Sequence, residues 1–258
     1  MGFFSCNFGQ NYRKDSIGLS QIENSESDAK DSLPEFGTLD SVQTGLNFLG
    51  GSNYVATKRN LVKLRSRLNQ RKALIVSPNE KVKFIDSISG VFTANLLNEI
   101  VPYWYGTEWD FEGHTSIPNI GQIACGYFVS TTLKDMGLKM NRYRFAQADP
   151  LTEAKSYAID TANFYEFERE NFNNLAELLS ALKGGLYFVG LDNHVGYFYK
   201  KDGKHYFIHA NFVDGKVMIE VAERSIAFTS SKYYFAKISS NRALALKWVM
   251  GSRIEIAN

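Results

Sequence analysis

The chain of 258 residues is long enough to build one sizeable hydrophobic core without cross-links. Its 44% hydrophobic and 22% charged residues are those of an ordinary globular protein, which excludes a disordered or fibrous chain. The net charge of +2, from 29 basic and 27 acidic residues, does not indicate a nucleic-acid partner. No apolar run reaches eighteen residues, so the sequence predicts no transmembrane helix.

The first 40 residues are poor in apolar side chains and show no period, which predicts a flexible N-terminal segment before a folded domain over 41–258. Within that segment, Cys6 follows a small residue and precedes a long polar stretch, as at the lipidated cysteine of bacterial lipoproteins. On this interpretation Cys6 carries a lipid anchor. The alternative is a tail that contains an incidental cysteine.

Apolar residues recur at helical spacing in the first half of the folded part. They predict helices over 53–68 and 86–100, and Pro102 ends the second helix. A short strand is expected over 73–76, stopped by the turn residues that follow. The one basic cluster, 58–72, is interpreted as the solvated face of the first helix.

Two loops come next, an aromatic one over 103–107 and a second over 112–121 that is rich in Gly, Ser, Pro and Asn. A helix is predicted over 125–136, because an apolar stripe runs through it and Gly137 is a typical residue after a helix C-terminus. The stretch 141–170 is polar and aromatic without a clear period. We interpret it as an insertion that shapes a cleft.

The second half changes from helical to β-like patterns. A helix is predicted over 174–182, and turns at 201–204 and 214–215 connect strands. The predicted strands are 186–191, 194–199, 206–210, 217–221 and 233–238. Helices followed by an antiparallel sheet indicate the α+β class, with a helical lobe packed against the sheet.

Cys125 is the strongest candidate for a catalytic residue. It stands at the predicted start of the helix over 125–136, directly after a loop that contains Gly and Pro. Free N–H groups and the partial positive charge of a helix N-terminus favour a thiolate and hold an oxyanion. The position suits a nucleophile. The alternative is a small buried cysteine that packs against the first turn.

Two of the four histidines complete the pattern. His194 opens one predicted strand, and a glycine two residues on leaves space beside its ring. His209 lies on the next strand, and a hairpin turn between the two strands would bring the rings side by side. A thiol nucleophile needs a base and a group that orients the base. We therefore expect Cys125, His194 and His209 to fill these three roles.

The order of these motifs resembles a known family. Tyr103-x-x-Gly106, Ala-Cys125-Gly, His194-Val-Gly-Tyr-Phe and Phe-Ile-His209-Ala follow one another as in the NlpC-type cell-wall cysteine peptidases, a papain-like group. The resemblance spans about residues 87–221. It departs from the family at the nucleophile, where Ala-Cys-Gly replaces the usual Asp-Cys-Ser, and in a longer loop before that cysteine.

The resemblance implies a papain-like fold, with Cys125 as nucleophile, His194 as base and His209 as the orienting residue. It also implies that the hydroxyl of Tyr103 faces the cleft. The implied substrate is a peptide or amide bond in the stem peptides of bacterial peptidoglycan. The implied location is the bacterial cell envelope, in the periplasm or on the membrane.

Further residues are candidates for oxyanion or substrate binding. Gln122 lies three residues before Cys125 and is a candidate oxyanion ligand or a surface amide. Trp104 is expected to line the cleft or pack in the core. Asn211 lies two residues beyond His209 on the same strand face and is an alternative orienting group. His114 precedes the nucleophile and is expected to be a bystander or to touch substrate.

The sequence predicts no metal site and no cofactor. It contains no Cys-x-x-Cys, no His-Glu-x-x-His and no phosphate-binding glycine loop. His205 and His209 would share one strand face about 13 Å apart, too far for one zinc ion.

Two functions other than hydrolysis remain open. The fold can serve as a non-catalytic binding protein of the cell envelope that retains the same residues. Alternatively, the protein is an acyltransferase in which an amine or alcohol replaces water in the second step.

Overall fold

The computed structural model describes Leu39 and residues 44–257. The expected flexible segment over 1–40, including Cys6, lies outside the described residues except for Leu39. Within the described part of the chain, no helix is long and apolar enough to span a membrane.

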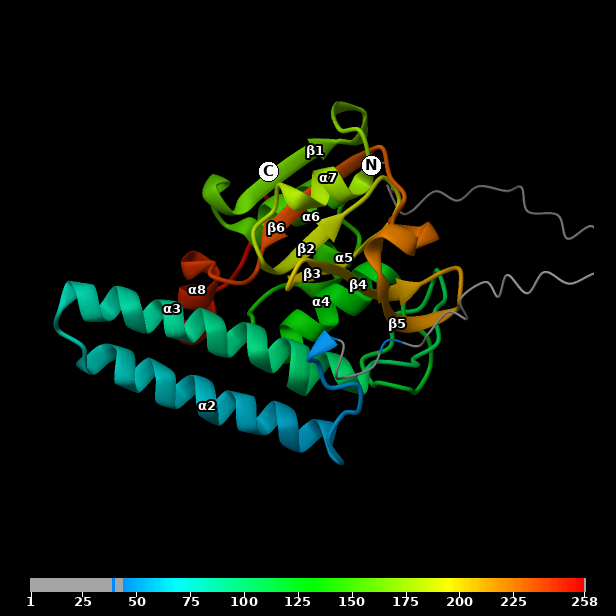
Figure 1. Cartoon of the computed structure of the whole chain (residues 1–258). Helices are drawn as coiled ribbons and strands as arrows, with labels where there is room; N and C mark the ends of the chain where they lie inside the picture. The colour runs from blue at the N-terminus through cyan, green and yellow to red at the C-terminus, as the bar shows by residue number, and fades with distance from the viewer. Residues whose placement is uncertain (1–38, 40–43, 258) are drawn as a thin grey trace, which may run out of the picture.

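A six-stranded sheet forms the centre of the molecule (Figure 1). Its strands stand in the order β1-β6-β2-β3-β4-β5, and every neighbouring pair is antiparallel. The strands are β1 Phe164–Glu168, β2 Gly185–Gly190, β3 Val195–Lys201, β4 Lys204–Asn211, β5 Lys216–Val221 and β6 Lys232–Lys237. The five predicted strands correspond to β2–β6, and the α+β class is confirmed.

Helices make up most of the rest of the described chain. They are α2 Tyr54–Leu74, α3 Pro78–Asn95, α4 Cys125–Asp135, α5 Arg142–Ala146, α6 Pro150–Ala158, α7 Leu175–Ser180 and α8 Arg242–Met250. A π-helical turn, Leu96–Ile100, and a 3-10 turn, Val101–Tyr103, extend α3. The predicted helices over 125–136 and 174–182 are confirmed as α4 and α7 to within two residues at each end.

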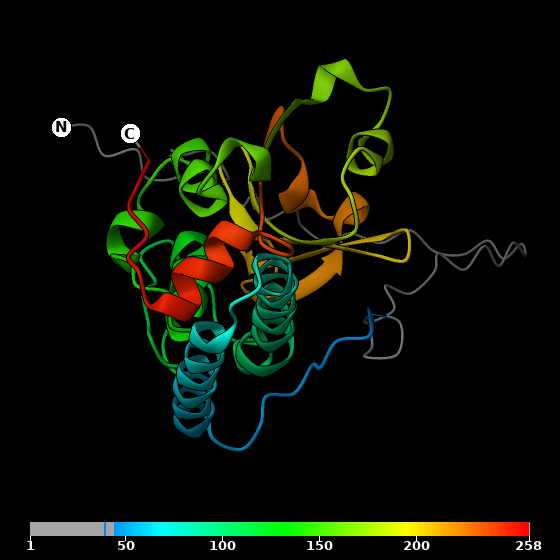
Figure 2. The same cartoon turned by 90° about the vertical axis from the view of Figure 1, so that its left-hand side faces the viewer.

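The two faces of the sheet are covered differently, as the views from two sides show (Figures 1 and 2). Side chains such as Tyr197 and Ile208 pack with those of α4 and of the helical layer formed by α2, α3 and α8. On the opposite face, Phe198 and Phe207 pack beneath α7 and the turns of residues 222–228. Because side chains alternate between the two faces along β3 and β4, these strands supply a row of apolar side chains to the core on each face of the sheet.

The prediction of a strand over 73–76 is wrong. Ala73 and Leu74 are the last residues of α2, and Ile75 forms its cap with an N–H···O bond to Lys72. The next helix begins at Pro78, eight residues earlier than predicted, because Ser77 caps its first turn and proline fits that turn. Only a short connection therefore separates α2 from α3, and the two helices form an antiparallel hairpin.

The stretch 141–170 contains regular elements that the sequence pattern did not indicate. It forms α5, α6 and the edge strand β1. Ala154 and Tyr157 of α6 are fully buried against β2 and β6, and Phe164–Glu168 pairs with β6 along its whole length. This segment is therefore part of both the sheet and its core.

Candidate active site

Cys125 is the first residue of α4, and its side chain is buried, with 8% of the residue exposed. The residue before it, Ala124, is extended and offers no side chain to cap the helix. Ala124 therefore supplies no side-chain acceptor to the first N–H groups of α4. Ala124 is anchored in turn by an N–H···O bond to Gly113 (2.8 Å), which joins the start of α4 to the preceding loop.

Gly126, beside the nucleophile candidate, allows a close backbone approach. A Cβ atom there would lie 2.4 Å from the carbonyl oxygen of Ala146, the last residue of α5. No side chain fits in that space. This contact is the physical reason for glycine in the Ala-Cys-Gly motif, and it places residues 146–150 along the cleft.

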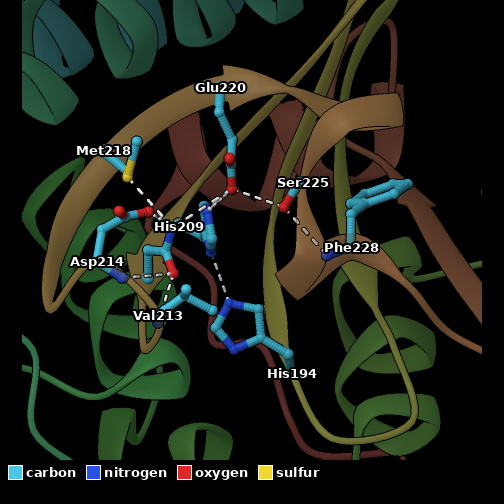
Figure 3. A network of polar contacts seen from close by, with 9 residues as sticks. His194, His209, Val213, Asp214, Met218, Glu220, Ser225 and Phe228 are labelled. Atoms are coloured by element: carbon cyan, nitrogen blue, oxygen red, sulfur yellow. Dashed lines mark hydrogen bonds and ion pairs between the residues drawn. The ribbon is translucent and has the colours of Figure 1, made fainter. Parts of the chain in front are cut away.

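A relay of hydrogen bonds runs from His194 through two further strands (Figure 3). Nε2 of His194, the residue before β3, lies 2.7 Å from Nδ1 of His209 on β4. Nε2 of His209 lies 2.8 Å from Oε1 of Glu220 on β5. The predicted side-by-side placement of the two rings is confirmed, with centroids 5.0 Å apart.

Glu220 is a member of the relay that the sequence analysis missed. In the β4–β5 ladder His209 stands opposite Met218, so Glu220 is its diagonal neighbour on the same face. Ser225 donates its hydroxyl to Oε1 of Glu220 at 2.6 Å. The only signal in the sequence is the position of Glu220 two residues beyond the partner of His209, and that partner is known only once the register is known.

Apolar packing shields the two imidazoles from most of the solvent. His194 is 3% exposed and lies edge-on to Phe207 and Phe212, while His209 is fully buried and stacks on Phe207 with centroids 3.9 Å apart. Burial lowers the pKa of His209 to about 3. Burial, with the neighbouring His209, also holds the pKa of His194 well below its usual value. Both rings are therefore neutral at pH 7.

The hydrogen bonds assign the protons of the neutral rings. Oε1 of Glu220 accepts the Ser225 hydroxyl, so it presents a lone pair to His209, whose Nε2 carries the proton. Nδ1 of His209 then accepts from Nε2–H of His194. The remaining lone pair of His194 is on Nδ1, on the side of its ring that faces away from His209 (Figure 3).

Asn211 supports the end of the relay. Its amide donates to Asp214 at 2.7 Å and to Oε1 of Glu220 at 3.4 Å, and its carbonyl oxygen accepts the N–H of Val213 at 2.7 Å. The described hydrogen bonds thus connect it to Glu220 and to the β4–β5 turn. Asn211 therefore holds Glu220, the third member of the relay, in place. The group bonded directly to His194 is His209 and not Asn211.

Cys125 and His194 line one cleft of about 1230 Å³. Aromatic side chains form much of its wall, among them Trp109, Phe111, Tyr127, Tyr143 and Phe212. Four carboxyl groups, those of Glu112, Asp149, Glu153 and Asp192, also line it, whereas the described lining contains no Lys or Arg. Residues 143–153 supply one side of the cleft, in agreement with the expectation that the stretch 141–170 shapes it.

Two aromatic candidates lie outside this cleft. The Tyr103 hydroxyl is 3.0 Å from Oγ1 of Thr57 on α2, so it does not face the cleft as the family resemblance implies. Trp104 is fully buried, and its ring N–H donates to the Tyr54 hydroxyl at 2.9 Å. Its packing against Phe128 makes it a core residue.

Two polar candidates have local roles. Gln122 is exposed, pairs through its backbone with Glu108 and Thr115, and is absent from the cleft lining. His114 lines the cleft mouth, but its Nδ1 is bonded to the carbonyl oxygen of Glu112 at 2.9 Å. Neither residue takes part in the relay.

The fourth histidine, His205, is bonded through Nδ1 to Glu223 and stands apart from the relay. In the part of the chain that the structure describes, no group of three or more His, Cys, Asp or Glu side chains is arranged to hold a metal ion.

Comparison with known proteins adds no relative. No protein-family model matches this chain, and neither a curated protein nor a solved structure matches it significantly.

Proposed function

We propose that the protein is a cysteine hydrolase with a papain-like arrangement, which cleaves an amide bond through an acyl-enzyme. One observation carries the proposal. The relay from His194 through His209 to Glu220 leaves a lone pair on Nδ1 of His194, and His194 lines the same cleft as a cysteine at the start of a helix. A base, its orienting chain and a thiol are the parts that nucleophilic catalysis requires.

In the proposed reaction, Nδ1 of His194 takes the proton of Cys125 as the sulfur attacks the carbonyl carbon. N–H groups at the start of α4 hold the resulting oxyanion. The tetrahedral species collapses, the C–N bond breaks, and the departing amine takes the proton from His194. Water then attacks the thioester with the same base, which releases the acid and restores the thiol.

The positive charge that forms on His194 is shared along the relay. When Nδ1 is protonated, the proton on Nε2 moves towards Nδ1 of His209 across 2.7 Å. The charge then lies beside the Glu220 carboxylate, 2.8 Å away. This neighbour offsets the burial that disfavours an imidazolium in the apolar surroundings of the two rings.

The cleft lining favours a particular substrate charge. Four carboxyl groups without a lysine or arginine repel anionic ligands, and aromatic faces attract cations. We therefore propose an acyl substrate that carries a protonated amine near the scissile bond. A peptidoglycan stem peptide, cleaved in the bacterial cell envelope, is the substrate that the family resemblance suggests.

The direct test is the rate of thiol labelling by iodoacetamide as a function of pH, with Cys6→Ser in every variant. We expect Cys125 to react well below pH 8, and His194→Ala to abolish this reactivity. His114→Ala is the matched control, because His114 lines the same cleft without joining the relay. Its labelling profile should equal that of the parent protein.

Slow labelling with ordinary thiol pH dependence, unchanged in His194→Ala, would replace this proposal with the non-catalytic binding protein. If labelling behaves as expected, peptidoglycan fragments with free and acetylated amines are assayed for hydrolysis. Cys125→Ser should abolish the product. A new amide that appears when an amine is added would identify an acyltransferase instead.

A further inference from the structure

The α2–α3 hairpin is a candidate interaction surface that the proposed catalytic chemistry does not use. It extends beside the rest of the molecule, and the connection between its helices lies at the end far from β3–β5 (Figures 1 and 2). Leu61 is the only buried residue among the 21 of α2. Most of the α2 surface is therefore not buried in the described structure, whereas α3 buries Ile85, Ile88, Ser89 and Phe92.

The tip of the hairpin is apolar and exposed. Leu74 and Val76 are 81% and 90% exposed, and with Ile75 between them they form three consecutive apolar residues. Exposed apolar residues that occur singly need no explanation, but a run at a protruding tip indicates an interaction site. Leu74 and Val76 do not contribute to the described core, whereas Ile75 between them is half-buried.

Cations surround the apolar tip. Arg71 and Lys72 lie in the last turn of α2, and Lys81 and Lys83 lie in the first turns of α3. None of these four forms an ion pair with a described residue. Residues 54–85 contain nine basic side chains and one acidic side chain, whereas the whole chain has a net charge of only +2.

The combination of an exposed apolar tip with neighbouring cations distinguishes between classes of partner. A nucleic acid would use the cations and leave the apolar tip in water. A protein groove would accept the apolar tip without needing a surrounding ring of cations. An anionic lipid bilayer uses both features, because apolar side chains enter the headgroup–acyl boundary while lysine and arginine stay with the lipid phosphates.

We propose that the α2–α3 hairpin docks the protein on an anionic lipid bilayer, with Leu74, Ile75 and Val76 inserted and the neighbouring cations on the headgroups. This docking is independent of Cys6 and of the proposed hydrolase activity. It places the protein at a membrane surface through the described hairpin, neither of whose helices is apolar enough to span a membrane.

The test is flotation of the full chain, carrying Cys6→Ser, with two kinds of vesicle. One is pure phosphatidylcholine and the other contains about one third phosphatidylglycerol. We expect binding to the anionic vesicles only, weakened by raised salt. Leu74→Ser/Val76→Ser and Arg71→Gln/Lys72→Gln should each lower the partition coefficient about tenfold or more.

Two matched controls isolate the tip. Val55→Ser/Ile226→Ser removes two apolar side chains that are 60% and 73% exposed elsewhere. Lys204→Gln/Arg224→Gln removes the same charge from exposed positions outside the hairpin. Both should bind like the parent, and all variants should keep the parent's thiol-labelling profile as a check of folding.

Three results would overturn the proposal. The first is that the parent fails to float with anionic vesicles. The second is that the tip variants bind as well as their controls. The third is that a single-stranded oligonucleotide binds through Arg71 and Lys72 while vesicles do not, which would assign the surface to nucleic acid.

Discussion

At the scale of single residues, Glu220 determines the proton positions on both imidazoles. Its Oε1 accepts from Ser225 and from His209, and this direction of bonding continues to Nδ1 of His194. Glu220 acts on the proposed base, His194, through the intervening ring of His209, so its proposed role is that of a positioning residue. Its charge also stabilises the imidazolium that forms during the proposed reaction.

Glu220→Gln keeps the shape of the side chain and removes its negative charge. We expect the midpoint of the Cys125 labelling profile to move up by about one pH unit, because the protonated relay loses its carboxylate neighbour. Labelling of the Cys6→Ser protein from pH 5 to 9 measures the midpoint.

The matched control for this change is Glu223→Gln. Glu223 is bonded to a histidine as well, but to His205, which stands outside the relay. Glu223→Gln should leave the Cys125 labelling profile unchanged. An equal shift in both variants would mean that the effect is one of overall charge, and the positioning role of Glu220 would be rejected.

At the scale of elements, the contact between α4 and α5 shapes the cleft next to Cys125. Gly126→Ala would place a methyl group 2.4 Å from the Ala146 carbonyl oxygen, so α5 must move. We expect the free energy of unfolding to fall by about 1–3 kcal/mol, as measured by urea denaturation. Cys125 labelling should change too, because residues 146–150 line the cleft.

Gly90→Ala is the control for a helical glycine without such a contact. A Cβ atom there meets nothing within 4 Å, and the residue lies inside α3. Alanine should therefore raise the free energy of unfolding by about 0.5–1 kcal/mol. If both substitutions gave the same sign, close packing at Gly126 would not explain the glycine of the Ala-Cys-Gly motif.

At the scale of the whole molecule, the buried neutral histidines make stability depend on pH. The pKa of His209 falls from an ordinary value near 6.5 to about 3 on folding, and that of His194 falls in the same direction. Below pH 6.5 the unfolded chain binds protons that the folded chain does not bind. The contribution of these neutral histidines to the free energy of unfolding is therefore fully present above about pH 6.5. It is lost as the pH falls towards their pKa values in the folded protein.

The expected loss at pH 5, relative to pH 7, is about 2 kcal/mol for His209, and His194 adds to it. Urea denaturation at pH 7, 6 and 5 measures it. His209→Asn should weaken the pH dependence of the free energy of unfolding. A free energy of unfolding that stays level from pH 7 to 5 would contradict neutral buried histidines.

The sequence alone determined the features that depend on neighbours a few positions away. The apolar stripe and Gly137 predicted α4, which places Cys125 at a helix start. Turn residues and strand alternation predicted the strands that bring His194 and His209 together. Both depend on local periods and turn chemistry, which the residues themselves carry.

Only the tertiary structure decided which distant groups meet. The register of β4 against β5 placed Glu220 diagonal to His209, and no local pattern contains that offset. Packing places the Tyr103 hydroxyl against α2 and Trp104 in the core. It also makes α5, α6 and β1 of the stretch 141–170. Partners far apart in sequence are selected by the fit of whole surfaces, which becomes defined only when the chain is folded.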